Sequence, residues 1–191
     1  MRKLLFAAVV GASLLAALVG GSFALAKNDK GGGVRAKLIG YNEVPSVSTA
    51  AKGKFRATID HQDTIEYELS YAGIEGGTAV AGHIHLGQRH TNGGVSAFLC
   101  GGGDKPACPS PGGTVKGTID AADVIGPAGQ GIAAGQIDEL IRAIRAGATY
   151  ANVHSTVYPG GEIRGQVKGG KGKGGGGDHD DDRNDDHDDD D

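Results

Sequence analysis

The sequence predicts an all-β domain of mainly antiparallel strands, either a Greek-key-like β-sandwich or a partly closed barrel, with one amphipathic helix. Three observations predict this class. Apolar and polar side chains alternate over many short segments. Glycine- and proline-rich turns separate these segments, and 36 of the 191 residues are glycine. A single segment, residues 136–146, instead places its apolar residues at spacings of three and four.

The alternation is clearest in two neighbouring segments. Phe55 and Ile59 share one face of residues 54–60, and Ile65 and Leu69 share one face of residues 64–70. The short turn between the two segments predicts an antiparallel hairpin. Further strands are predicted at residues 34–39, 79–86, 95–99, 114–119, 149–155 and 162–167.

In the last of these strands, Ile163 and Val167 are predicted to face the core. Glu162 and Arg164 are then expected on the outer face, where they would form a surface ion pair worth under about 1 kcal/mol. The alternative is that these two residues orient His154.

The helical segment is amphipathic. Its apolar residues, Leu140 and Ile144 among them, lie on one face, and acidic residues precede basic ones along it, as the helix dipole favours. Gly147 is a natural end for such a helix. We expect the helix to cover one end or edge of the sheet.

The first 26 residues have the pattern of a secretory signal peptide. Arg2 and Lys3 precede an uncharged apolar run from Leu4 to Val19, and Ala24-Leu25-Ala26 is a small-x-small cleavage site. The alternative, an uncleaved membrane anchor, needs about 20 apolar residues, and this run is shorter. We therefore expect a secreted or extracytoplasmic protein, in the periplasm or at the cell surface, with no transmembrane segment after cleavage.

The rest of the chain divides by composition. Residues 27–33 form a Gly-rich linker, residues 34–168 the folded domain, and residues 169–191 a disordered Gly/Lys linker with an Asp-rich tail. Residues 178–191 contain ten Asp and one Arg, whereas residues 27–177 have a net charge of +3. This weak, dispersed positive charge argues against a nucleic-acid partner. The acidic tail is expected to aid solubility or, alternatively, to bind divalent cations such as Ca²⁺ weakly.

Cys100 and Cys108 are the two cysteines of the chain. In an exported protein such a pair predicts a local disulfide that closes a short Gly/Pro-rich loop. Their spacing does not fit a CxxC redox or zinc motif.

Three histidines form a candidate metal site. His83 and His85 are two residues apart on a predicted strand, so their side chains share a face with Cα atoms about 6.5–7 Å apart. His154 lies on another strand, on the face that it shares with Tyr150 and Asn152. If the two strands are neighbours, the imidazoles can converge on one Cu or Zn ion. The alternative is that His83 and His85 hydrogen-bond to a neighbouring loop.

Several stretches together indicate a family. They are Gly40–Pro45 followed by Gly53, Gly82–Gly87, the helix ending at Gly147, Tyr150–Ser155, and Pro159–Gln166. In this order and spacing the chain resembles the CHRD (chordin) domain family from residue 34 to residue 167. The resemblance implies an extracellular or periplasmic β domain. Chordin carries repeated copies together with cysteine-rich growth-factor-binding modules, whereas this chain has one copy and none of those modules, so growth-factor antagonism is not implied.

The histidine pattern is also similar to that of copper/zinc superoxide dismutase. There a His-x-His strand and a later strand histidine hold copper on the outside of a Greek-key barrel. The similarity implies that His83, His85 and His154 occupy the copper positions and that His90 is the candidate bridging ligand. The sequence shows no zinc subsite or long metal loop, so dismutation is not implied.

Catalytic motifs are absent from the sequence: it contains no nucleophile elbow, no Walker loop and no HExxH. We therefore expect an exported non-catalytic binding or interaction module at the cell envelope or outside the cell, whose partner is a protein, an envelope polymer or a metal. The alternative is a copper- or zinc-binding protein, or a superoxide dismutase-like metalloenzyme, that uses the three histidines.

Export predicts a defined mature N-terminus. The protein recovered from outside the cytoplasm should begin at Lys27, because signal peptidase cleaves after the small-x-small site that ends at Ala26. N-terminal sequencing checks this, and a recovered protein that begins at Met1 would contradict it.

Overall fold

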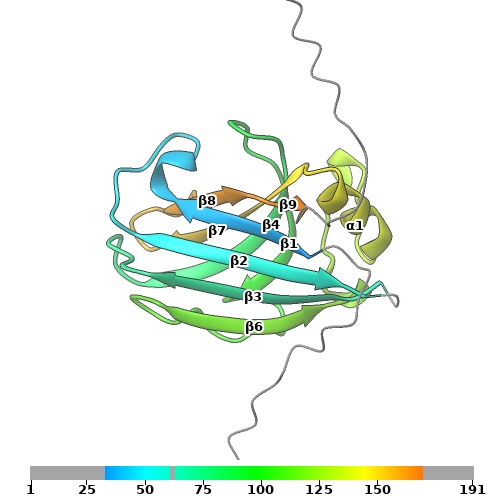
Figure 1. The fold of residues 1–191 in the computed structure, drawn as a ribbon, viewed down its shortest axis with the longest axis horizontal. Coiled ribbons are helices and arrows are strands. Elements are labelled where there is room, and N and C mark those ends of the chain that lie inside the picture. Colours follow the sequence, from blue (N-terminus) through cyan, green and yellow to red (C-terminus); the bar gives the residue numbers. More distant parts are fainter. Residues whose placement is uncertain (1–32, 61–62, 170–191) are drawn as a thin grey trace, which may run out of the picture.

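The computed structural model describes residues 33–60 and 63–169 (Figure 1). Within this part of the chain, nine strands and one α-helix form. Each of the eight predicted segments contains a strand, and the short β9 is added to them. The elements are β1 (Val34–Ile39), β2 (Lys52–Ile59), β3 (Ile65–Ala72), β4 (Ala79–Leu86), β5 (Val95–Cys100), β6 (Gly113–Ile119), α1 (Ile137–Arg145), β7 (Thr149–Ser155), β8 (Ile163–Gln166) and β9 (Lys168–Gly169).

All pairings between these strands are antiparallel, and their order is β5-β4-β7-β8-β1-β2-β3-β6, with β9 beside β1. The neighbours β4–β7, β8–β1 and β3–β6 are distant in sequence, as in a Greek key. Figure 1 shows the sheet curving so that β1, β2, β3 and β6 lie over the remaining strands. The predicted all-β class with a partly closed barrel is therefore confirmed.

A tyrosine links β5, at one edge of this curved sheet, to β3, the neighbour of the other edge strand β6. Tyr67 on β3 donates its hydroxyl proton to the backbone carbonyl of Leu99 on β5, at 2.7 Å. On the way its ring passes over Gly117 of β6, where a Cβ atom would stand 2.7 Å from the hydroxyl oxygen. This contact brings the β5 edge against the β3–β6 edge and nearly closes the barrel.

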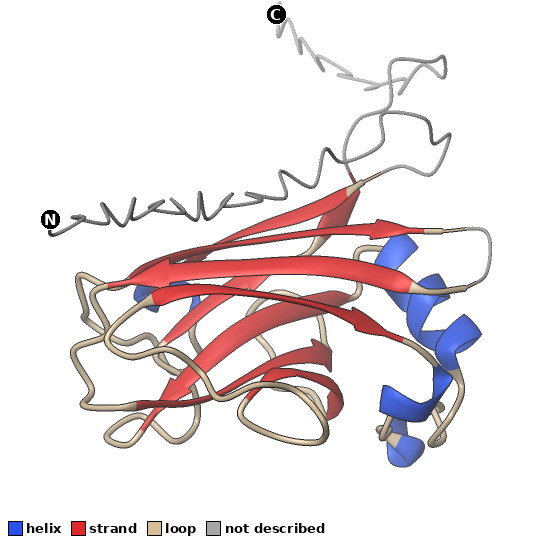
Figure 2. Cartoon of the chain, turned by 90° about the horizontal axis from the view of Figure 1, so that it is seen from below, coloured by secondary structure: helices blue, strands red, loops and turns tan. Residues whose placement is uncertain are grey.

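The core is aliphatic, because the chain has no tryptophan and only four phenylalanines. Phe55, Ile65 and Val153 are each 0 % exposed, as the two-residue alternation predicts. Helix α1 adds Leu140, Ile141 and Ile144 to the same core. Figure 2 shows this helix at one end of the sheet, where it was expected.

The predicted disulfide is present between Cys100 and Cys108. Cys100 is the last residue of β5 and is fully buried, and Cys108 lies in the segment that leads to β6. The bond therefore ties the two strands at the edges of the sheet. Within residues 33–60 and 63–169, no helix has the length and apolarity needed to cross a membrane. The predicted signal peptide, linkers and acidic tail lie outside the described residues, except Gly33 and Gly169, the second of which belongs to β9.

Removal of the disulfide should weaken the fold. In the chain-entropy model a loop this short contributes about 2–3 kcal/mol, so Cys100→Ala/Cys108→Ala should lower the free energy of unfolding by about that amount. Urea unfolding of the oxidised wild type and of the double variant measures the difference. Wild-type protein reduced with dithiothreitol is the control and should match the variant. Equal stability of all three samples would contradict the prediction.

Candidate metal centre

The three histidines lie on adjacent strands. His83 and His85 are on β4, and His154 is on β7, which pairs antiparallel with β4. The residues that alternate with them, such as Ile84 and Val153, belong to the core, so the imidazoles stand on the outer face of the barrel. They are nevertheless 7–8 % exposed, because loops cover this part of the sheet. The outer-face position is the one that the superoxide dismutase similarity implies.

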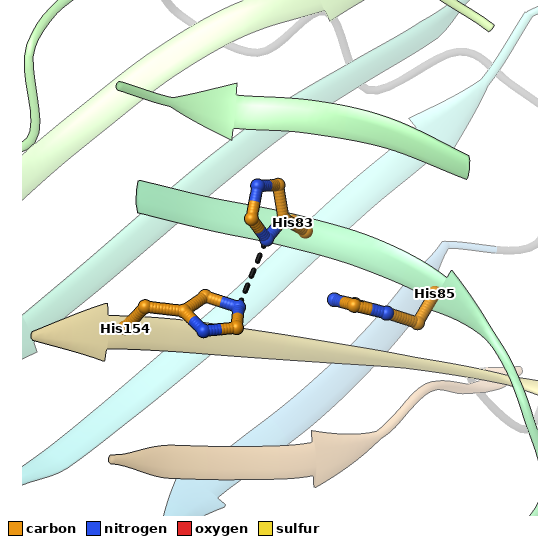
Figure 3. Close-up of side chains that lie close together, drawn as sticks. All are labelled: His83, His85 and His154. Carbon is orange, nitrogen blue, oxygen red and sulfur yellow. Dashed lines mark hydrogen bonds between the residues drawn. The ribbon is translucent and has the colours of Figure 1, made fainter. Parts of the chain in front are cut away.

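The imidazoles converge on one point. One nitrogen from each ring can be chosen so that all three lie within 4.8 Å of one another. The shortest distance, 2.9 Å, joins His83 Nδ1 to His154 Nε2. Figure 3 shows the His85 ring directing a nitrogen towards this pair. The folded chain thus places the three candidate ligands together.

Backbone carbonyls fix which nitrogen of the His85 and His154 rings faces the cluster. His85 Nδ1 is 2.9 Å from the carbonyl oxygen of Gly93, and His154 Nδ1 is 2.9 Å from that of Pro159. A carbonyl oxygen can only accept, so both Nδ1 atoms carry the proton. In the neutral rings both Nε2 atoms therefore present lone pairs to the cluster. Such outer hydrogen bonds are typical of metal-binding histidines.

Few hydrogen-bond donors face the point where the three imidazoles converge. His85 Nε2 is buried and has no hydrogen-bond partner among the described residues. The Asn152 side-chain oxygen lies 3.1 Å from His154 Nε2, and in this tautomer neither atom has a proton to share. Of the three rings, only His83 points an N–H group into the cluster, and it donates to His154 Nε2. The Asn152 side chain is the other polar group that interacts with these imidazoles. A cation at this point would satisfy lone pairs that otherwise face one another.

The environment keeps the rings neutral. Burial, followed by the neighbouring His154 and His85 rings, lowers the pKa of His83 to about 3. Burial lowers the pKa of His85 to about 4, although the Gly93 carbonyl opposes this shift. Burial also lowers the pKa of His154. At neutral pH all three imidazoles are uncharged, which is the form that binds metals.

A stack of side chains packs against the face of the His85 ring. The Tyr150 ring is parallel to the His85 ring, with centroids 4.7 Å apart and an interplanar angle of 7°. The Arg164 guanidinium lies 3.4 Å from the centre of the Tyr150 ring. Arg164 in turn donates to the carbonyl oxygens of Gln88 and Thr91, at 2.9 and 2.7 Å. The stack therefore connects a candidate ligand to the loop that follows β4.

The predicted surface ion pair between Glu162 and Arg164 is wrong. Both residues are buried, at 0 % and 1 % exposure, because loops cover the outer face of β8. The Glu162 carboxylate accepts hydrogen bonds from the Thr49 hydroxyl and from the backbone N–H groups of Glu75 and Gly76. Arg164 contacts Tyr150, and through it His85, rather than His154. Alternation gave the right face, but it could not show that loops bury that face.

Glu43 is a further buried polar residue near this stack. Burial raises the pKa of its carboxyl to about 7, and the nearby Arg164 guanidinium only partly offsets the effect. One carboxyl oxygen, Oε1, has no partner among the described residues. The backbone of Gly161 passes close to both the Glu43 carboxyl and the Asn152 amide, and a Cβ there would collide with both. In the sequence, Glu43 stands out only as part of the Gly40–Pro45 motif.

His90 does not join the cluster. It is exposed in a turn after β4, with a positive φ of 61°. The group of converging metal-ligating side chains found in the described residues consists of His83, His85 and His154. The bridging role that the superoxide dismutase similarity implied for His90 therefore has no support in the fold.

Fold and site together define an antiparallel β-barrel domain with three buried histidines converging on its outer face. The family model of the CHRD domain matches residues 34–167, which is more than half of the chain. The chain therefore belongs to the CHRD domain family, as the sequence motifs indicated. No curated protein and no solved structure matches the chain.

The lowered histidine pKa values make the stability of the metal-free protein depend on pH. An unfolded histidine takes up its proton near pH 6.5, whereas folded His85 has a pKa of about 4. Between these values the unfolded state binds more protons, so the free energy of unfolding falls as the pH is lowered from 6.5 towards 4. Urea unfolding in EDTA at pH 7 and at pH 5 measures this loss.

The matched variant is His85→Gln, which cannot take up a proton in either state. Between pH 7 and pH 5 the wild type should lose on the order of 1 kcal/mol more than the variant. Carboxyl groups, Glu43 included, titrate in both proteins and cancel in the comparison. Equal losses would mean that folded His85 titrates as it does in the unfolded chain.

Proposed function

We propose that this chain is an exported CHRD-domain protein that binds one copper or zinc ion through His83 Nδ1, His85 Nε2 and His154 Nε2. The observation that carries the proposal is the convergence of these nitrogens, with His85 Nε2 buried and unpartnered. The sequence predicted a binding module, and under this proposal its ligand is a metal ion. Non-catalytic action remains a prediction.

The geometry is close to that of a bound site. Ligand atoms about 2.0–2.1 Å from a tetrahedral ion stand roughly 3.3 Å from one another. The distances among the three nitrogens, from 2.9 Å up to 4.8 Å, bracket this value. Metal binding then needs small ring rotations and a shift of the His83 proton from Nδ1 to Nε2, because a metal ligand needs a free lone pair. Neutral imidazole suits both metals, and divalent copper binds such ligands more tightly than zinc.

Three nitrogens leave further coordination positions open. The Asn152 side-chain oxygen, 3.1 Å from His154 Nε2, is the nearest protein atom that can serve as an additional ligand. An open position is also what a copper enzyme requires. Superoxide turnover is a separate prediction from metal binding. A visible copper absorption band together with a dismutation assay would test it.

Export is supported by two independent features. Residues 1–26 have the sequence of a signal peptide. The disulfide between Cys100 and Cys108 fits an oxidising compartment such as the periplasm or the extracellular space. A protein or envelope partner is not specified by the three-histidine site and remains a prediction.

Copper binding by the full-length mature chain tests the proposal. After dialysis against Cu²⁺ and removal of excess metal, wild-type protein should hold one copper ion more per chain than His83→Gln/His85→Gln, because the variant keeps one imidazole of three. Elemental analysis gives this difference, and electron paramagnetic resonance of the wild type should show a copper signal with coupling to several nitrogens that is weaker in the variant.

His90→Gln is the matched control, since it removes an exposed histidine from the turn beside the site. It should retain the copper of the wild type. Any copper that the acidic tail binds is common to all three proteins and does not affect the comparison. Equal copper content in wild type and double variant would refute the three-histidine site.

A further inference from the structure

A cluster of positive side chains lies on the outer face of β1 and β2, which β8 separates from β7 in the sheet order. We call it the basic face. All of its members are exposed, because they alternate with core residues such as Leu38 and Phe55. The basic face consists of Arg35, Lys37, Lys52, Lys54 and Arg56.

The register of the two strands sets like charges opposite one another. Arg35 pairs with Arg56, and Lys37 pairs with Lys54. Like charges directly opposite on antiparallel strands destabilise a sheet. Lys168 of β9 extends the row, since it pairs with Arg35 on the other side of β1.

Neighbouring acidic residues do not compensate this charge. Glu68 of β3 lies opposite Arg56, but its carboxylate forms an ion pair with Lys116 of β6 at 3.0 Å. Lys54 faces Ser70 in the register. In the residues that the structure describes, none of the five basic-face residues has an ion-pair partner.

A shallow groove of about 650 Å³ opens on the same face. Lys37, Lys52 and Lys54 line it together with Ser70 and Thr114. Ammonium groups and hydroxyls are hydrogen-bond donors to carboxylates. The other lining residues are Gly, Ala, Pro and Tyr, so the three lysines give the groove the charge that fits an acidic peptide.

The chain itself contains such a peptide. Residues 178–191 carry ten Asp and one Arg. The described chain ends at β9, directly beside Arg35 of the basic face. The eight Gly- and Lys-rich residues 170–177 span about 16 Å if they behave as a flexible linker, and neighbouring strands are about 4.8 Å apart. Both β1 and β2 are thus within reach.

We propose that the acidic segment 178–191 docks on the basic face of its own domain. Attachment through a short linker gives the segment an effective concentration in the millimolar range, which exceeds that of a dilute external polyanion. Docking neutralises the like-charge pairs of β1 and β2 and covers the groove. It also depends on ionic strength, because the charges are exposed to solvent.

Zero-length carbodiimide cross-linking of the mature full-length chain tests the proposal, because it joins an Asp to a Lys only when the two are in contact. At low salt, mass spectrometry should find links from residues 178–191 to Lys37, Lys52 and Lys54 in the monomer. In 1 M NaCl these links should fall about tenfold, since the Debye length shortens to about 3 Å. Links to the lysines of the connecting linker are not counted.

Two controls make the result decisive. Lys37→Gln/Lys54→Gln should reduce the remaining links to Lys52, whereas Lys116→Gln, which removes an already paired lysine, should leave all three sites unchanged. A mixture of ¹⁵N-labelled and unlabelled chains separates links within a chain from links between chains. Links between chains would overturn the proposal by making a second copy the occupant. Absent links, or links spread evenly to Lys105 and Lys116, would overturn it as well.

Discussion

The antiparallel pairing of β4 with β7 is the constraint on which the rest of the site depends. It sets Asn152 opposite His83 and brings His154 beside them, while Ile84 and Val153 point into the core. Burial of the aliphatic face fixes this register, because a slip of one residue would move the histidines inward and the apolar side chains outward. The imidazole geometry is therefore held in place by the hydrophobic core.

Above this pair of strands the protein forms a second, polar buried layer. The carbonyls of Gly93 and Pro159 fix the histidine tautomers, and Arg164 holds Tyr150 against the ring of His85. Such a layer is costly to bury unless its polar atoms are satisfied. Most of them are, and the exceptions beside the histidines are His85 Nε2 and Glu43 Oε1; the hydroxyls of Ser96 and Thr149 are the other buried side-chain atoms without a partner among the described residues. In a purely structural network every buried lone pair has a hydrogen-bond donor. Here lone pairs converge without enough donors, and this is what marks the histidines as a candidate metal site.

Much of the fold followed from local patterns. Two-residue alternation located eight strands, the three-and-four spacing located α1, and the two cysteines predicted their own bond. The three histidines were also found, because the His-x-His spacing places two rings on one face. Arg164 and Glu162 were placed on the correct face but were wrongly expected in solvent. Alternation predicts which side of a sheet a residue faces. It does not predict whether loops from distant parts of the chain cover that side.

By itself, the sequence determined the strand and helix positions, the disulfide, the family and the identity of the candidate ligands, since each depends on residues close together or on a motif. Only the tertiary structure decided which strands are neighbours, and with it the meeting of His154 with His83 and His85. It also decided that Arg35 faces Arg56 and that Lys37 faces Lys54. The reason is physical: strand order and register arise from closing long loops around one shared core, and that closure is a property of the whole chain.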